Sequence, residues 1–320
     1  MPRPCSLVFA TAMLLAGLLN AACDAAAPAR VLPDVDARFQ HHRILHAGRT
    51  LAYRLYDPYT QSCAPSNVHL TSRALPLLIW FHGRGESGDN QRDQLAWLEL
   101  ILGSGDGQQE FPAWILAPQF PRGTPPWVAR ASSHEDDKAT ADPLRDVDAM
   151  LAHVLAHQPV DTRRIGLAGI SQGATAAWEY ARRHPGRFAA LLSLATTDTR
   201  HLTAPGKPAP AVWALQSTAD GNPLLTRVGQ RLTELRQSGR PTRWTVIDAP
   251  DHDCWTAALR EHRAHRWLIQ QRLPANPDER STATHSVVLV GAGFAGTLLL
   301  LLLRMMAQVR NGPRVRRAAE

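Results

Sequence analysis

The chain has 320 residues, of which 44% are hydrophobic and 20% charged, and this balance excludes a fibrous or broadly disordered protein. Its formal net charge is +7, but no basic stripe with interleaved aromatic residues accompanies that charge, so we expect no nucleic-acid partner. Much of the excess lies near the C-terminus, in Arg304, Arg310, Arg314, Arg316 and Arg317.

Residues 1–27 have the pattern of a secretory signal peptide. Arg3 precedes an apolar stretch from Leu7 to Leu19, and small residues follow it. We expect cleavage between Ala22 and Ala29 and export to the periplasm or cell surface. Cys23 leaves lipidation open as a less favoured alternative, because Asn20 stands where a lipobox has leucine.

The region 31–273 alternates strand-like and helix-like segments and is predicted to form one domain. A hairpin is expected first, with strands Arg43–His46 and Leu51–Tyr56. Short apolar runs predict the buried strands Leu77–Phe81, Trp114–Ala117, Arg164–Ala168, Ala189–Leu194, Ala211–Gln216 and Trp244–Ile247. Helices are predicted at Asp146–His157, Ala174–Arg183, Leu224–Gln237 and Trp255–Gln271. This alternation indicates an α/β fold with a mostly parallel, doubly wound sheet and flanking helices.

The segment Gly169-Ile170-Ser171-Gln172-Gly173 matches the G-x-S-x-G pattern at a predicted strand-to-helix turn. The glycines leave room for a sharp turn that raises the serine hydroxyl above the sheet, at the N-terminus of a helix. A five-residue match also arises by chance, but here the required strand and helix flank it. We therefore predict that Ser171 is a catalytic nucleophile.

A serine hydroxyl needs a base to take its proton, and an acid that holds this base in one tautomer. In chains with this motif the order is serine, acid, histidine. Asp220 follows one predicted strand and His252 follows the next. Because these loops lie at the same edge of a parallel sheet as Ser171, we predict a Ser171–Asp220–His252 triad. Asp248, Asp251 and Asp253 are the competing acids.

An oxyanion hole needs two donors, and backbone N–H groups commonly supply them. We expect one from Gln172 and the other from Arg84, with Gly83 as the alternative. The side chains of His82, Arg84 and Glu86 are interpreted as bracing this loop. Trp127 and Trp255, with Trp114, are weak candidates for lining a substrate pocket, although core packing explains at least two of these three.

Four motifs, in this order, resemble the phospholipase/carboxylesterase and predicted-peptidase branch of the α/β-hydrolases. They are Pro76–Gly88, Trp114–Gln119, Gly169–Gly173 and His252–Trp255. The resemblance covers about Arg43 to Leu273. It implies the α/β-hydrolase fold, hydrolysis of an ester or thioester through an acyl-enzyme, and neither a cofactor nor a metal. The chain departs from this pattern at Asp251, where glycine is frequent, and in the loop approaching Asp220.

Two cysteines, Cys63 and Cys254, remain if the signal peptide is removed at or after Cys23. We interpret them as two separate thiols, and a disulfide between them, which an exported protein allows, is the alternative.

The C-terminal end is predicted to anchor the protein to a membrane. Residues 274–285 are read as a linker, 286–307 as a transmembrane helix and 308–320 as a basic cytoplasmic tail. Gly291-Ala292-Gly293-Phe294-Ala295-Gly296 also matches a dinucleotide-binding turn. A truncated Rossmann-like remnant is therefore the alternative, since too little chain follows for a working site.

The predicted function is thus that of a serine esterase acting on a small-molecule ester. A serine peptidase of the same fold and a non-catalytic, hydrolase-like binding module are the alternatives.

Overall fold

A computed structural model describes residues 33–60, 73–103, 111–122, 127, 142–200, 202, 210–237, 239 and 241–275. Contacts between residues divide the chain into two units, 1–273 and 274–320, and only Pro274 and Ala275 of the second are described. The predicted signal peptide, the rest of the linker, the membrane span and the tail lie outside the described residues, as does Cys63. Within the described ranges, no helix has the length and apolar character that crossing a membrane requires.

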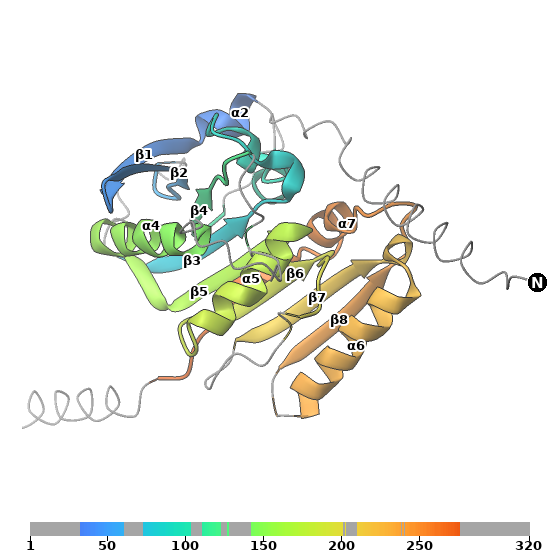
Figure 1. The fold of residues 1–320 in the computed structure, drawn as a ribbon. Helices are drawn as coiled ribbons and strands as arrows, with labels where there is room; N and C mark the ends of the chain where they lie inside the picture. The colour runs from blue at the N-terminus through green and yellow to red at the C-terminus, as the bar shows by residue number, and fades with distance from the viewer. Residues whose placement is uncertain are drawn as a thin grey trace, which may run out of the picture. The chain divides into compact units, whose positions relative to one another are not determined.

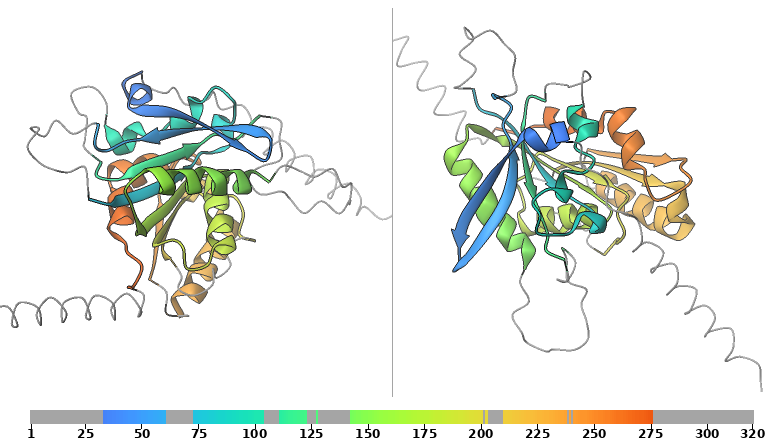
Figure 2. Two further views of the ribbon diagram at one scale, coloured as in Figure 1. Left: turned by 90° about the vertical axis from the view of Figure 1, so that its left-hand side faces the viewer. Right: turned by 90° about the horizontal axis from the view of Figure 1, so that it is seen from above.

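One eight-stranded sheet organises the first unit, with the strand order β1-β2-β4-β3-β5-β6-β7-β8 (Figure 1). β1 and β2 form an antiparallel hairpin, β2 pairs antiparallel with β4, and the other neighbours are parallel. The blue hairpin lies at one edge of the sheet, and β8 at the other (Figure 2). The strands are β1 (Phe39–His46), β2 (Arg49–Tyr56), β3 (Leu75–Phe81), β4 (Trp114–Pro118), β5 (Val160–Ile170), β6 (Ala190–Leu194), β7 (Ala211–Ser217) and β8 (Thr242–Ile247).

Helices pack on both faces of this sheet. α4, α5 and α6 contribute to one hydrophobic cluster, whereas α3, α7 and α8 contribute to the other. The main helices are α2 (Pro33–Ala37), α3 (Glu99–Leu102), α4 (Pro143–His157), α5 (Gln172–Arg183), α6 (Asn222–Gln237), α7 (Trp255–Arg260) and α8 (Ala264–Gln270). Three single turns of 3-10 helix accompany them, at η3 (Arg84–Glu86), η4 (Asp93–Leu95) and η6 (Thr218–Asp220).

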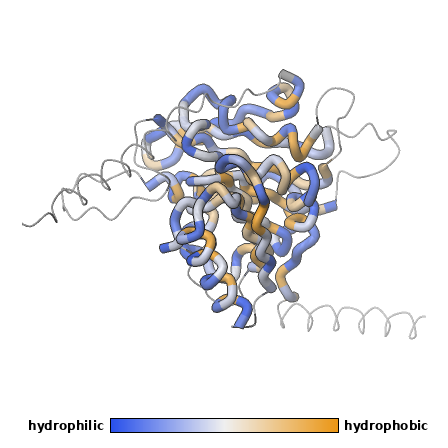
Figure 3. The backbone as a smooth tube through the Cα atoms, turned by 90° about the vertical axis from the view of Figure 1, so that its right-hand side faces the viewer, coloured by the Kyte–Doolittle hydropathy of each residue, from blue (hydrophilic) through white to orange (hydrophobic). Residues whose placement is uncertain are grey.

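The central strand β3 shows why the core has two halves. Successive side chains of a strand point to opposite faces. Leu77, Ile79 and Phe81 therefore join the cluster of α4, α5 and α6, while Leu78 and Trp80 join the other. A wholly apolar strand is the expected result of burial on both faces. Figure 3 shows hydrophobic stretches of the chain gathered inside and hydrophilic ones outside.

The predicted strands all occur, with shifted ends. The prediction that Trp244–Ile247 is buried is wrong, because β8 is the last strand of the sheet and is only partly covered, with Val246 43% exposed. β5 begins at Val160 rather than Arg164 and includes a polar stretch whose backbone pairs with β3 across a register shift. The apolar pattern missed this extension because a ladder of backbone hydrogen bonds does not require apolar side chains.

The single helix predicted at Trp255–Gln271 is wrong, because the segment forms two helices, α7 and α8. Arg263 between them adopts a left-handed conformation with φ 47°. In one continuous helix, Ala264 would lie about one and two-thirds turns after Ala258, which is roughly 120° away around the helix axis. The break turns both residues into the same hydrophobic cluster.

Candidate active site

Ser171 occupies a sharp turn between β5 and α5, with φ 52° and ψ −119°. A non-glycine residue rarely adopts this backbone conformation, and it persists only where its surroundings enforce it. Gly169 supplies one constraint, because a Cβ atom there would lie 2.2 Å from the carbonyl oxygen of Gly173. The turn is therefore possible only with glycine at position 169.

Gly173 brings the start of α5 against the end of β3. A Cβ atom at this position would lie 2.1 Å from the carbonyl oxygen of Phe81 and 2.4 Å from that of His82. Since β3 and β5 are parallel neighbours, this contact places the loop after β3 beside the turn that carries Ser171. The two glycines of the motif thus have different roles. Gly169 permits the turn at Ser171, and Gly173 allows the loop after β3 to lie beside that turn.

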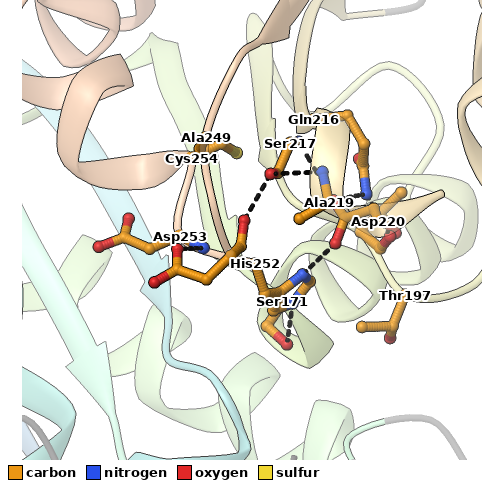
Figure 4. A network of polar contacts seen from close by, with 12 residues as sticks. Ser171, Thr197, Gln216, Ser217, Ala219, Asp220, Ala249, His252, Asp253 and Cys254 are labelled. Atoms are coloured by element: carbon orange, nitrogen blue, oxygen red, sulfur yellow. Dashed lines mark hydrogen bonds and ion pairs between the residues drawn. The ribbon is translucent and has the colours of Figure 1, made fainter. Parts of the chain in front are cut away.

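Ser171, His252 and Asp220 meet at the carboxyl edge of the sheet (Figure 4). His252 Nε2 lies 3.0 Å from the Ser171 hydroxyl oxygen, and His252 Nδ1 hydrogen-bonds Asp220 Oδ1. A carboxylate only accepts, so these partners assign the proton to Nδ1 and leave Nε2 to accept from the serine. The three residues predicted as a triad therefore lie within hydrogen-bonding reach of one another.

Asp220 is held by hydrogen bonds on its second oxygen. Gln216 Nε2 donates to Asp220 Oδ2 at 2.8 Å, and the backbone N–H of Ser217 donates at 3.1 Å. The Gln216 amide is fully buried and also donates to the carbonyl oxygen of Thr196 at 2.9 Å, two residues after the end of β6. The acid is therefore tied to the strand next to the one that leads to Ser171. Gln216 is a residue that the sequence pattern did not single out.

A second set of contacts joins the acid loop to the histidine loop. The Ser217 hydroxyl donates to the carbonyl oxygen of Asp251, next to His252, and Thr218 Oγ1 donates to Asp248 Oδ1 at 3.0 Å. The competing acids have other partners. Asp251 Oδ1 accepts from the backbone N–H of Asp253, and both oxygens of Asp253 accept from Thr256 at the start of α7.

The two predicted oxyanion donors lie in adjoining elements. Gln172 is the first residue of α5, and the N–H groups of the first turn of a helix have no acceptor within that helix. Arg84 begins η3 directly after the buried Gly83, in the loop that Gly173 contacts through β3. The Arg84 side chain is exposed.

His82 braces that loop from inside the protein. Its ring is fully buried, Nδ1 donates to the carbonyl oxygen of Gly83 at 2.6 Å, and Nε2 accepts from the Phe120 N–H at 3.0 Å. Burial lowers the pKa of His82 to about 4, so the ring is neutral at pH 7. The bracing role expected for this residue matches these contacts.

Glu86 is buried in the same loop, with a hydrogen bond from Trp97 Nε1 to its Oε1 at 3.3 Å. Burial raises the pKa of this carboxyl, and the Trp97 hydrogen bond offsets part of the rise. Trp97 in turn contacts Trp255, with ring centroids 5.6 Å apart. No sequence motif pointed to Trp97.

The tryptophans proposed for a substrate pocket have different surroundings. Trp127 is 3% exposed, and its Nε1 donates to the carbonyl oxygen of His82 at 3.2 Å, so it packs in the core and braces the loop instead of lining an open pocket. Trp114 is a core residue of β4. Trp255 is the one beside the triad, with its ring edge-to-face with His252 at 5.6 Å.

Cys254 is a free, buried thiol whose Sγ donates to the carbonyl oxygen of Leu215. Burial, reinforced by the charges of Asp220 and Asp253, raises its pKa to about 12. The structure therefore has Cys254 as a protonated packing residue and not as half of a disulfide.

The chemistry available at this site is that of a hydroxyl nucleophile with a base and an orienting acid. No group of three or more metal-ligating side chains is suitably placed in the described part of the chain.

No protein-family model and no curated protein matches the chain. Among solved structures it is similar to a thermostable esterase, with 22% identity and a TM-score of 0.60 over 74% of this chain and 64% of that one. The chain thus spans less than two thirds of that esterase. It is also similar to fluorophosphonate-binding serine hydrolase F of Staphylococcus aureus, with 14% identity, a TM-score of 0.51 and coverage of 72% and 98%. Together with the strand order, these similarities show that the chain has the α/β-hydrolase fold.

Proposed function

We propose that the protein is a serine hydrolase that cleaves carboxylic esters or thioesters through an acyl-enzyme. The observation that carries this proposal is the chain of contacts from Ser171 through His252 to Asp220. It coincides with a positive φ at Ser171, a backbone conformation that non-glycine residues rarely adopt.

In the proposed reaction, His252 Nε2 takes the hydroxyl proton of Ser171 while the serine oxygen attacks the substrate carbonyl carbon. The tetrahedral intermediate collapses, and the imidazolium returns the proton to the leaving oxygen or sulfur. Water then attacks the acyl-serine, with His252 again acting as base, and releases the acid. Asp220 remains ionised and stabilises the imidazolium in both steps.

The N–H groups of Gln172 and Arg84, or Gly83, are proposed to hold the negative oxygen of that intermediate. The contact of Gly173 with the end of β3 supports this assignment, because it brings the two donor segments together. Backbone donors of this kind act in place, without reorganisation as charge develops.

An ester or thioester is preferred over an amide as the substrate because of the resemblance of four motifs to the phospholipase/carboxylesterase branch. A peptidase uses the same triad, so the geometry does not separate the two. The test is turnover of p-nitrophenyl acyl esters of increasing chain length by the parent and by Ser171→Ala.

We expect the parent to turn over these esters and Ser171→Ala to lose roughly three orders of magnitude or more in kcat. Ser193→Ala is the matched control, since the buried Ser193 hydroxyl has no hydrogen-bond partner among the described residues. Equal rates in the parent and Ser171→Ala would overturn the proposal. Cleavage of amide substrates in preference to esters would point to the peptidase.

Absence of fluorophosphonate labelling at Ser171 in the folded protein would favour the non-catalytic binding module instead.

Export and membrane attachment are further proposals, supported only by the sequence of residues 1–27 and 286–307. Fractionation of cells that express the full chain tests them, and recovery of the protein in the soluble cytoplasmic fraction would contradict both.

A further inference from the structure

Three aromatic rings stand in a row beginning at the proposed general base. His252 contacts Trp255 edge-to-face, with centroids 5.6 Å apart and planes at 85°. Trp255 contacts Trp97 in the same manner, at 5.6 Å and 66°. Trp255 is only 9% exposed, whereas Trp97 is half-buried. Trp97 is therefore the ring of this indole pair that an incoming molecule reaches.

Trp97 holds its position against backbone strain. Its φ is 71°, in the left-handed region that a bulky side chain rarely occupies. The hydrogen bond from its indole nitrogen to the buried Glu86 fixes the ring, together with its contact to Trp255. Residues with such rarely populated backbone conformations cluster at active sites and ligand-binding sites.

The place of the pair beside His252 decides which part of a substrate it meets. His252 Nε2 returns its proton to the leaving oxygen, so the leaving group must lie next to the imidazole. The indole pair is in contact with that same ring through Trp255. The pair thus lies on the leaving-group side of the proposed reaction centre.

We propose that Trp97 and Trp255 form a subsite for the alcohol part of the ester, and that this part is an aryl or arylmethyl group. The inference rests on the proposed esterase function. Aromatic rings prefer the edge-to-face contacts that this row already uses, and they gain from them beyond what burial of their surface provides. The Glu86 carboxylate that accepts from Trp97 is itself buried, so the exposed part of this surface is the indole ring.

The experiment compares two esters of the same acid, benzyl acetate and cyclohexylmethyl acetate. The two alcohols are similar in size, but only one is aromatic, and the more apolar of the two is the aliphatic one. We expect kcat/KM of the parent to favour benzyl acetate by about 2- to 12-fold. This ratio is expected to fall to about 1 in Trp97→Leu and to keep an intermediate value in Trp97→Phe.

Trp267→Leu is the matched control, because Trp267 is also partly buried but contacts Trp213 and Arg243 rather than the His252 row. Its ratio should equal that of the parent. A parent that hydrolyses both acetates with a ratio of 1 or below overturns the subsite and leaves the esterase function standing. If folded Trp97→Leu or Trp97→Phe keeps the parent's ratio of kcat/KM for the two acetates, the subsite is likewise overturned and the esterase function stands.

Failure of the parent to hydrolyse either acetate, together with absence of fluorophosphonate labelling at Ser171, overturns both the esterase function and the subsite. Since the parent ratio needs no variant, the proposal is testable even if Trp97→Leu does not fold.

Discussion

Two loops that meet at Ser171 are held in place by opposite means. The acid loop after β7 is fixed by polar contacts around a charged group, with Gln216 and Ser217 donating to Asp220. The loop after β3 is fixed from inside, by the buried and neutral ring of His82 and by Glu86, buried beneath Trp97. Both loops contribute residues to one site, but the first surrounds a carboxylate with donors, whereas the second contains a buried histidine ring that is neutral at pH 7.

This difference predicts that substitutions in the acid loop mainly change turnover, whereas the loop after β3 mainly affects the pH dependence of stability. A substitution at Asp220 that removes its charge but keeps an acceptor for Gln216 and Ser217 should change turnover more than the free energy of unfolding, because the buried donors keep their partner. A buried neutral histidine couples folding to pH, because the unfolded chain binds a proton that the folded chain excludes. Measuring both turnover and unfolding in each variant tests this separation.

The largest effect is expected from Asp220→Asn, with a loss of roughly 10³- to 10⁴-fold in kcat. Gln216 and Ser217 both donate to the Oδ2 position, so the amide oxygen of the new residue should settle there. Its NH2 group then faces His252 Nδ1 and forces the imidazole proton onto Nε2, the nitrogen that must accept from Ser171. Ester turnover and urea unfolding measure the two consequences.

Asp248→Asn is the control for that substitution, since an amide oxygen there still accepts from Thr218. The separation of the two loops would be wrong if Asp220→Asn unfolded the protein as strongly as it slowed the reaction.

The next effect concerns stability and pH. The pKa of His82 is lowered to about 4 by burial, against about 6.5 in an unfolded chain. Above pH 6.5 both states are neutral, and between pH 6.5 and about 4 only the unfolded state takes up the proton. The free energy of unfolding should therefore fall by about 3 kcal/mol on this account as the pH is lowered from 7 to 4. Urea unfolding followed across this range measures the fall.

His265 on α8 gives a matched comparison with His82. Its ring contacts Phe111, and burial also lowers its pKa to about 4. His82→Gln and His265→Leu should each remove one such contribution to the pH dependence. Only His82→Gln should also slow turnover, since it alone alters the loop with the proposed oxyanion donor. Equal effects of both variants on turnover would contradict the bracing role of His82.

The smallest effect is expected from Gln216→Leu, with about a 10-fold loss of kcat from removal of one hydrogen bond to a charged group. The Ser217 N–H still holds Asp220, so the loss should stay well below that of Asp220→Asn. Gln230→Leu, on an exposed face of α6, is the control and should turn over esters like the parent. A rate for Gln216→Leu within twofold of the parent would show that the second donor suffices alone.

Much of this arrangement was predictable from local patterns. Apolar runs of strand length located β3 to β8, and the hairpin pattern located β1 and β2. In the central strands the apolar side chains follow from burial on both faces. The glycines at positions 169 and 173 around Ser171 predicted the turn. Only glycine fits there, because a Cβ atom at either position would clash with the backbone. Asp220 and His252 were located by following strands in order to their carboxyl ends.

The errors have a common source in packing between distant segments. The break between α7 and α8 follows from the need to bury Ala258 and Ala264 on one side. Trp127 was a candidate for a substrate pocket, with core packing as the alternative, and it lies against His82, a contact between residues 45 positions apart. Composition alone does not tell a pocket tryptophan from a core one, because both are large, apolar and rich in contacts.

Local patterns and chain order were enough to locate the strands, the sharp turn at Ser171 and the three side chains of the proposed triad, because each depends on neighbouring residues or on the order of the segments. Only the tertiary structure decided what surrounds them: the Gln216 amide on Asp220, the buried frame of His82, and Trp97 beside Trp255. These contacts join loops that come from different strands, and no local pattern records which side chains will meet when the strands are brought side by side.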